Sequence, residues 1–544
     1  MAQKKPQTLG ELKAGGYSPR GVKDELRQNL RCAIERRETP FSGIHGYERT
    51  VLPALYNAIL SRHDLLLLGL RGQAKTRLLR MLVQLLDPEI PSIAGSELNE
   101  DPFSPITKYG RRMLSERGDE TPITWIPREE RYREKLATPD VTIADLIGDI
   151  DPIKAATERR SYSDEEVIHF GIVPRTNRGI FAINELPDLQ PRIQVGLLNI
   201  LEERDLQIRG FPVRIPLDIL LVFSANPEDY TNRGNIITPL KDRISSQIFT
   251  HYPDDVKTAA KITAQEAWLD RKGGASIDMP NVFRELVEEI AFAARASEFV
   301  DQSSGVSARM PISAIEILAS NLERRGLVHG EKRVSPRLCD LPATLPAITG
   351  KVEMVYEGEQ QGAEVVAKKL IGTAVKKLFD SRFPAPDAGR PSERRRHELD
   401  EDDESGPQRR SRAAPQPEKI HALYEPIVAW FAAGNRITLS DDTAFSEHLS
   451  SLKSVPGLEK AVEEHFSPAT PEELAIGMEL VLEGLTQHLK IAREDLDSRV
   501  SYAEMLKFDF YTSNGHGKQK DFVQDYWQQF QARQANAAVA TTTR

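Results

Sequence analysis

The chain is poor in cysteine and in long apolar segments. Only Cys32 and Cys339 occur among 544 residues, which excludes a disulfide framework and a zinc site built from several cysteines. We expect both thiols to behave as small buried apolar groups. The longest apolar run, around 65–68, falls far short of the ~18 residues that a membrane-spanning helix needs. Because the basic N-terminus lacks an apolar segment typical of secretion signals, the sequence predicts a cytoplasmic protein without a membrane anchor.

Basic side chains are also outnumbered, with 72 Lys and Arg against 81 Asp and Glu and a net charge of −9. This balance argues against a nucleic-acid coat and against a membrane-surface binder. Basic clusters at 394–396 and 409–412 alternate with acidic runs, a pattern typical of a solvated linker. A DNA-associated motor therefore depends on these clusters alone, and would need salt-dependent DNA binding to support it.

Apolar runs of strand length alternate with amphipathic helical stretches in the first half of the chain. The runs at 64–70, 179–186 and 218–226 are continuous, as expected of parallel strands buried on both faces. Apolar residues repeat at helical spacing in 76–86 and 192–204. The predicted fold class is therefore α/β, a parallel sheet flanked by helices. Helical patterns follow, then a proline-rich charged segment, then helical patterns again.

We accordingly predict six segments. They are a lead-in segment at 1–40, an α/β nucleotide-binding domain at 41–255, a helical lid and extension at 256–383, a flexible charged linker at 384–419, a helical module at 420–495, and a largely disordered tail at 496–544.

A phosphate-binding loop is predicted between the first apolar strand and the helix that follows it. The segment GLRGQAKT has Ala74 where the usual G-x-x-x-x-G-K-[ST] pattern has its second glycine. A loop between strand and helix can direct backbone N–H groups at a polyphosphate. In that arrangement Lys75 would reach the β- and γ-phosphates and Thr76 would bind Mg²⁺. The alternative is a plain turn between strand and helix with an exposed lysine.

Polar residues end the next two predicted strands. Asn184 and Glu185 follow GIFAI, where a nucleotide hydrolase would be expected to carry an acidic pair. Glu185 can polarise an attacking water, whereas Asn184 offers a neutral carbonyl for positioning Mg²⁺ through water. Asn226 ends the third strand and could contact the water or the γ-phosphate, although an Asx turn before Pro227 would explain it as well.

Together these features resemble the AAA+ ATPases, specifically the branch of the magnesium chelatase AAA+ subunit and the MoxR-type ATPases. The resemblance covers about 40–340, and its loop is similar to MoxR-type loops in carrying Ala-Lys-Ser/Thr. The segment 43–59 resembles the entry segment of that branch, and 137–155 followed by 169–186 resembles the stretch around its helix-2 insert. The segment 205–216 looks like the hairpin that precedes the Asn-tipped strand.

The resemblance implies further roles. Asn226 would be sensor 1, Arg243 the arginine finger that completes a neighbour's site, and Arg309 sensor 2 on the lid. Without it both arginines would be ordinary surface cations. The expected cofactors are ATP and Mg²⁺, the latter held by Thr76 and, through water, by Asn184. The nucleotide-binding residues would be Gly69, Leu70, Arg71, Gly72, Gln73, Ala74, Lys75, Thr76 and Arg309.

The resemblance also implies partners and outputs. It implies a homo-oligomer, a hexameric ring, with a von Willebrand A-type partner on a separate chain because no D-x-S-x-S motif occurs here. The favoured output is remodelling of a protein partner, and the ATPase subunit of a metal chelatase is an alternative. Because Asn184 replaces the usual Walker B aspartate, a nucleotide-dependent assembly scaffold with weak or no hydrolysis is the other alternative.

Overall fold

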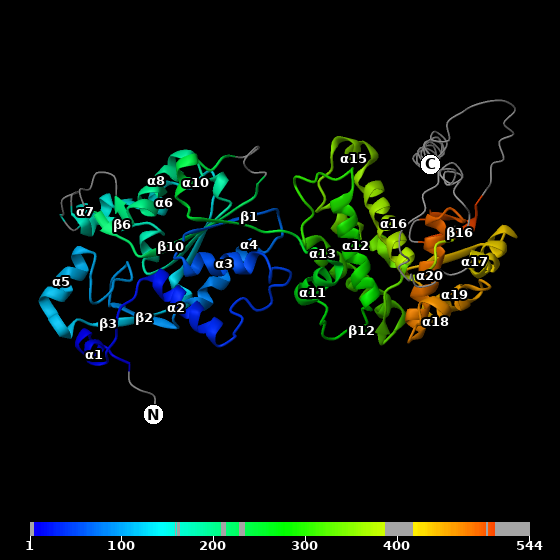
Figure 1. Ribbon diagram of the computed structural model, residues 1–544, viewed down its shortest axis with the longest axis horizontal. Coiled ribbons are helices and arrows are strands. Elements are labelled where there is room, and N and C mark those ends of the chain that lie inside the picture. The colour runs from blue at the N-terminus through cyan, green and yellow to red at the C-terminus, as the bar shows by residue number, and fades with distance from the viewer. Residues whose placement is uncertain are drawn as a thin grey trace, which may run out of the picture.

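The computed structural model describes residues 5–157, 159, 164–207, 214–227, 234–386, 417–496 and 499–505. The chain runs from an α/β domain through a helical lid to a C-terminal module (Figure 1). The predicted fold class, with its parallel sheet, lid and C-terminal helical region, is confirmed. Most of the predicted linker and tail lies outside the described residues.

A five-stranded parallel sheet forms the centre of the α/β domain, in the order β11-β1-β10-β7-β4. All four leucines of β1 are buried, which explains why this strand reads as a continuous apolar run. The strand β1 lies between β10 and β11, with Leu65 opposite both Val222 and Ser246. The strands are β1 (Leu65–Leu68), β4 (Tyr132–Leu136), β7 (Gly179–Asn184), β10 (Ile219–Ala225) and β11 (Ser246–Phe249).

Helices cover both faces of this sheet. Leu65 and Leu67 share one core with α2, α3 and α4, while Leu66 and Leu68 share another with α8, because side chains alternate along a strand. Helix α2 precedes residue 41, yet it buries Leu26 and Leu30 in the first of these cores. The helices of the domain are α1 (Leu9–Ala14), α2 (Val22–Glu35), α3 (Val51–Leu60), α4 (Lys75–Met81), α5 (Lys108–Arg117), α6 (Ile143–Leu146), α7 (Pro152–Thr157), α8 (Pro191–Glu202) and α10 (Thr238–Arg243).

The described residues also form three pairs of short antiparallel strands beside the sheet. One pair lies between α4 and β4 with α5 between its strands, a second lies within 148–170 with α7 between its strands, and a third precedes β10. Their strands are β2 (Glu89–Ile93) with β3 (Ile123–Pro127), β5 (Gly148–Ile150) with β6 (Ile168–Phe170), and β8 (Asp205–Gln207) with β9 (Arg214–Pro216). The 3₁₀ turns are η1 (Leu82–Leu85), η2 (Gly118–Glu120), η3 (Arg128–Arg131), η4 (Glu165–Val167), η5 (Pro174–Thr176), η6 (Leu186–Asp188) and η7 (Leu338–Thr344).

The lid and the C-terminal module share one hydrophobic core, in which α16 packs against both α12 and α20 (Figure 1). The lid elements are α11 (Val256–Glu266), β12 (Ser276–Ile277), α12 (Asn281–Ala296), α13 (Arg309–His329), β13 (Arg333–Val334), α14 (Leu345–Thr349), α15 (Tyr356–Gln361) and α16 (Ala363–Arg382). The helices of the module are α17 (Pro417–Ala432), α18 (Phe445–Lys453), α19 (Leu458–His465) and α20 (Pro471–Gln487).

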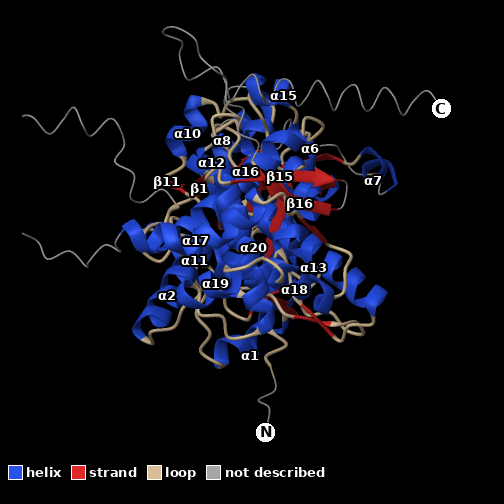
Figure 2. Ribbon diagram, turned by 90° about the vertical axis from the view of Figure 1, so that its right-hand side faces the viewer, coloured by secondary structure: helices blue, strands red, loops and turns tan. Residues whose placement is uncertain are grey.

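The module also contains an antiparallel sheet that the sequence analysis did not anticipate. Its strands are β14 (Ile437–Ser440), β15 (Ile491–Leu496) and β16 (Arg499–Glu504), in the order β14-β16-β15, and Figure 2 shows β15 and β16 beside α20. The strand β16 belongs to the segment predicted as a largely disordered tail, but it buries Val500 and Tyr502 and is ordered. Charged residues in the middle of β15 and at both ends of β16 hid the apolar positions of these strands. Within the described ranges, no helix combines the length and the apolar character needed to cross a membrane.

Candidate nucleotide-binding site

The loop from Gly69 to Thr76 joins β1 to α4, as predicted, and the helix begins at Lys75. Ala74 caps the helix in the left-handed region, with φ 57° and ψ 16°. A side chain in this region costs about 1 kcal/mol or more, because its Cβ approaches the backbone. The usual sequence pattern has a glycine at this position. Here Ala74 adopts the left-handed conformation that a glycine would adopt without strain.

Two glycines of the loop pass too close to their neighbours to carry a side chain. A Cβ at Gly69 would collide with the Thr250 hydroxyl and the Gln73 side chain. Gly72 has φ +74°, and a Cβ there would collide with the Ser307 hydroxyl and lie 2.8 Å from the Ala308 backbone nitrogen. Because Ser307 and Ala308 belong to the lid, Gly72 allows the lid to close directly onto the loop.

Lys75 lies at the centre of the candidate site and is only 7% exposed. Its ammonium group donates hydrogen bonds to the carbonyl oxygens of Gly69 and of Leu70, the latter at 3.0 Å, and to Asn226 Oδ1 at 2.6 Å. A buried ammonium is stable only when its donors are paired in this way. The loop and the tip of β10 therefore meet at one amino group.

Asn184 and Glu185 complete the cluster from the end of β7. Asn226 Nδ2 donates to Glu185 Oε2 at 3.0 Å, so Lys75, Asn226 and Glu185 form a continuous chain of hydrogen bonds. Asn184 Oδ1 accepts from Thr76 Oγ1 at 3.4 Å. The structure thus brings together the predicted lysine, threonine, carboxylate and both asparagines at the carboxyl edge of the sheet, where α/β sheets bind ligands.

Oxygen donors at this edge fit Mg²⁺ better than a softer ion. The Thr76 hydroxyl and the Asn184 amide oxygen lie side by side, and Mg²⁺ prefers oxygen ligands and few protein contacts when phosphates are also bound. Ser224 Oγ donates to Asn184 Oδ1 at 3.1 Å and fixes which amide atom faces Thr76. Asn184 and Ser224 together present a neutral acceptor where an aspartate would present a charge.

Residues outside the predicted motifs hold the loop in place. Tyr47 Oη lies 2.8 Å from the carbonyl oxygen of Gln73 and 2.9 Å from that of His251, and its single hydrogen is shared between these two acceptors. Thr250 Oγ1 donates to Gln73 Oε1 at 2.7 Å, and Tyr252 Oη donates to the Arg71 carbonyl at 2.8 Å. Burial raises the pKa of Tyr47 well above its usual range, so its hydroxyl stays a donor. Thr250, His251 and Tyr252 directly follow β11. Strand β11 was not predicted because polar residues interrupt its apolar pattern, so these three residues were not expected beside the loop.

The lid contacts the loop through ions as well. Arg71 forms an ion pair of 2.6 Å with Glu353, and the Ser304 hydroxyl donates to the same carboxylate. The hydrogen bond from the Ser304 hydroxyl is the main cause that lowers the pKa of Glu353, and Arg71 lowers it further. Both ion-pair partners are about half exposed, so the pair contributes little to stability.

The two predicted arginines lie in different surroundings. Arg309 is exposed at the start of α13, directly after Ser307 and Ala308, the two residues that meet the loop. Arg243 ends α10 and pairs with Glu202 at 2.7 Å on α8. The structure therefore places Arg309 on the lid segment beside the loop, but does not bring Arg243 into the cluster around Lys75.

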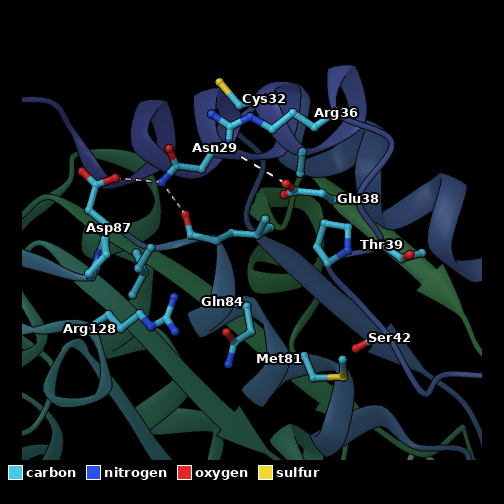
Figure 3. Close-up of a pocket in the computed structure, with 15 residues that line it drawn as sticks. Asn29, Cys32, Arg36, Glu38, Thr39, Ser42, Met81, Gln84, Asp87 and Arg128 are labelled. Carbon is cyan, nitrogen blue, oxygen red and sulfur yellow. Dashed lines mark hydrogen bonds and ion pairs between the residues drawn. The ribbon is translucent and has the colours of Figure 1, made fainter.

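A groove of about 640 Å³ lies between α2 and the α4–η1 segment, and it contains none of the predicted site residues. Figure 3 shows Asn29 spanning its rim, where Nδ2 donates to Asp87 Oδ1 and to the Leu85 carbonyl, both at 2.9 Å. Arg36 and Arg128 also line this groove. The candidate site is therefore the cluster at the strand ends, not this groove.

The sheet, the loop and the polar strand ends define a P-loop nucleotide-binding domain with a helical lid. Residues 122–244 match the family described as "AAA domain (dynein-related subfamily)". The matched residues include Glu185, Asn226 and Arg243 but not the phosphate loop, which rests on its own sequence and geometry.

Curated relatives are magnesium chelatase subunits. The chain is 28% identical over 237 residues to the magnesium-chelatase subunit ChlI of Nostoc sp., covering 43% of this chain and 59% of that one. It is 27% identical over 282 residues to the chloroplastic subunit ChlI-1 of Arabidopsis thaliana, covering 51% and 60%. This chain therefore spans less than two thirds of the length of either relative. The predicted resemblance to the magnesium chelatase branch is confirmed.

A similar solved structure describes the complex between subunits BchI and BchD of magnesium chelatase. The sequence identity is 20%, with 59% of this chain and 98% of that one covered and a TM-score of 0.31.

Proposed function

We propose that this protein is an ATP hydrolase that assembles as a homo-oligomeric, hexameric ring and uses ATP turnover to remodel a protein partner. The observation that carries the proposal is the chain of hydrogen bonds from Lys75 through Asn226 to Glu185 at the edge of the sheet. The location that we propose is the cytoplasm, whose reducing conditions would keep both cysteines as the free thiols that they are in this chain.

Each residue of the cluster has a distinct task in this proposal. Lys75 would leave its carbonyl partners for the β- and γ-phosphates, and the Glu185 carboxylate would orient the attacking water. Asn226 touches both side chains, so it can transmit the state of the phosphate to the water-orienting group. Thr76 and Asn184 would hold Mg²⁺, which neutralises charge on the phosphate oxygens. Arg309 would contact nucleotide from the lid.

Arg243 supports a site shared between subunits. In this chain it pairs with Glu202 on α8 instead of facing Lys75, as a finger that serves a neighbour would. A guanidinium placed against the transferring phosphate contributes strongly to phosphoryl transfer. The partner would be a separate chain of the von Willebrand A type, and the alternative output is the ATPase step of a metal chelatase.

Steady-state ATP hydrolysis with Glu185→Gln tests the proposal. We expect turnover that rises with protein concentration and falls by about 100-fold or more in the variant, because the water loses its base, while ATP binding persists. Glu120→Gln, an exposed carboxylate remote from the cluster, is the matched control. Turnover equal to background in the wild type with ATP bound would contradict hydrolysis by this chain alone and favour the assembly scaffold, for which Asn184 is the supporting observation.

Mixing two inactive variants tests the shared site. Arg243→Ala retains a complete cluster but lacks the finger, whereas Glu185→Gln retains the finger. In mixed rings a Glu185→Gln neighbour would restore the Arg243→Ala site, so the mixture should exceed the sum of the separate activities. Strict additivity at concentrations that support assembly would refute the finger assignment.

A further inference from the structure

A second polar cluster lies far from the nucleotide loop, where the lid meets the C-terminal module. Cys339 comes from η7, His448 from α18 and Glu479 from α20, and one ligand atom from each lies within 4.8 Å of the others. The three residues are 8%, 1% and 0% exposed. Packing of three separate elements therefore brings a thiol, an imidazole and a carboxylate together inside the core.

The polar atoms of this cluster are incompletely satisfied by the described residues. His448 Nδ1 is buried without a hydrogen-bond partner, and His448 Nε2 and Glu479 Oε1 face each other at 2.5 Å as an ion-pair contact that lacks hydrogen-bond geometry. The other carboxylate oxygen accepts from the Cys339 backbone N–H at 2.9 Å, which turns Oε1 toward the imidazole. Buried polar atoms without partners are costly, and a cation bound between Nε2 and Oε1 would satisfy both of these atoms.

Among the described residues, His448 is the one that forms an ion pair with this carboxylate. Asp340 is paired with Arg325 at 2.7 Å, whereas Arg337 donates to the Thr443 carbonyl at 2.9 Å and also interacts electrostatically with Glu479 and Cys339. Burial raises the pKa of the Cys339 thiol well above its usual range, with Glu479 adding to the effect, so the thiol stays neutral unless a cation binds it.

We propose that Cys339, His448 and Glu479 form a binding site for a single Zn²⁺ ion. Thiolate, imidazole and carboxylate are the three side-chain ligand types that Zn²⁺ takes in proteins. The thiolate and the carboxylate would balance its two charges, and the Cys339 proton would be released on binding. Ligand bonds of about 2.0–2.2 Å in a tetrahedral arrangement set the Nε2–Oε1 separation at about 3.4 Å, so the imidazole and the carboxylate move apart by about 1 Å. A water would take the fourth position.

Such an ion would cross-link the lid to the C-terminal module. Cys339 lies on the lid side and the other two ligands on the module side of the same hydrophobic core. A metal bond across this boundary would resist separation of the module during lid movement. This role does not depend on nucleotide binding, so a test of the zinc site is independent of whether the protein hydrolyses ATP.

Metal content and Co²⁺ spectroscopy test the site in the full-length chain, purified without a polyhistidine tag. We expect one zinc per chain, and after exchange into Co²⁺ a thiolate-to-metal charge-transfer band in the near ultraviolet. The band should disappear in Cys339→Ser and persist in Cys32→Ser, which removes the other, partly exposed thiol.

A wild-type chain that retains no zinc and gives no Co²⁺–thiolate band would overturn the proposal and leave a buried His–Glu pair. A band lost in Cys32→Ser but kept in Cys339→Ser would overturn it equally. Because Cys339→Ser could impair folding, unfolding of the wild type is measured with and without zinc chelation. A lower midpoint after chelation supports the site, and an unchanged midpoint contradicts it.

Discussion

The two polar clusters of this molecule differ in how the chain assembles them. The Lys75 cluster collects residues at the ends of adjacent parallel strands, so that its members follow directly from short apolar runs. The Cys339 cluster collects residues from a 3₁₀ turn and two helices, inside a core shared by two regions. The pairing of the parallel strands brings the first cluster together, because their carboxyl ends meet at one edge of the sheet, whereas the second depends on the packing of helices against one another. Variants that unfold one region while sparing the other can test this distinction.

The largest effect is expected from Arg325→Met in α13. Arg325 and Asp340 are 1% and 0% exposed at the side chain and form a 2.7 Å ion pair. Removing Arg325 leaves the buried Asp340 carboxylate without its ionic partner, which typically costs about 3–5 kcal/mol. Chemical denaturation followed by fluorescence should therefore show a much lower midpoint for the lid and module.

Arg324→Met on the same helix is the matched control. Arg324 is 57% exposed at the side chain and pairs with Asp441 at 3.3 Å, so its loss should cost less than about 1 kcal/mol. Equal midpoints for the two variants would show that burial of the Arg325 pair does not govern this core.

Glu288→Gln should abolish a pH dependence of lid stability. Burial raises the pKa of Glu288 from 4.5 to about 7, against the opposing effects of the Thr263 hydroxyl and Arg295. The folded state therefore holds a proton that the unfolded state has lost, and stability falls as pH rises from about 4.5 to about 7. This shift corresponds to a loss of roughly 3 kcal/mol, complete above the upper value.

Denaturation midpoints at pH 5 and pH 8 measure this effect. The free energy of unfolding should fall more between pH 5 and pH 8 in the wild type than in Glu288→Gln. Glu298→Gln, an exposed carboxylate just beyond the same helix, should behave like the wild type. A Glu288→Gln profile that parallels the wild type would show that Glu288 is ionised normally.

In the strand-end cluster, Lys75→Ala should lower ATP turnover by about 100-fold or more, because the phosphates lose a buried positive charge. Lys257→Ala, an exposed lysine on α11, is the control. Turnover and ATP binding are measured together with lid denaturation, which Lys75→Ala should leave unchanged. Loss of lid stability along with turnover would show that the two regions are not independent.

The contrast also explains how far the sequence alone could lead. The buried strands at β1, β7 and β10 were predictable because each is a continuous apolar run. The loop pattern after β1 then identified Lys75, and the polar end of β7 identified Glu185. Strand β11 was not predicted, because it lies at the sheet edge with a mixed polar pattern. Thr250, which follows β11 and contacts Gln73, therefore went unnoticed, and no local motif marked Tyr47, which contacts the Gln73 carbonyl.

The C-terminal module was less predictable for a physical reason. Strand β15 carries three consecutive charged residues and β16 is charged at both ends, while the buried Ile491, Val500 and Tyr502 face a core supplied mainly by helices of the lid and module. Neither Cys339 nor His448 has a neighbouring residue with metal-ligand spacing, so no local pattern marks them. A motif can reveal residues that one turn or strand end brings together, but not residues that only packing unites.

The smallest effect is expected from Ala74→Gly in the phosphate loop. Ala74 lies in the left-handed region, where its Cβ is strained, and glycine removes that strain. The gain exceeds the extra entropy that glycine brings to the unfolded chain, and we expect the α/β domain to be stabilised by about 0.5–1 kcal/mol. Ala432→Gly, at an exposed right-handed position near the end of α17, should instead be destabilising by a similar amount.

Opposite signs for these two alanines, measured by denaturation, would mean that the loop conformation is imposed on Ala74 by its surroundings. The contacts of Gly69 with Thr250 and of Gly72 with the lid are the features that impose it. If Ala74→Gly lowers stability as Ala432→Gly does, the loop is relaxed with alanine and its shape arises locally. In that case the local sequence of the loop, and not its contacts with Thr250 and the lid, would determine the shape of this part of the strand-end cluster.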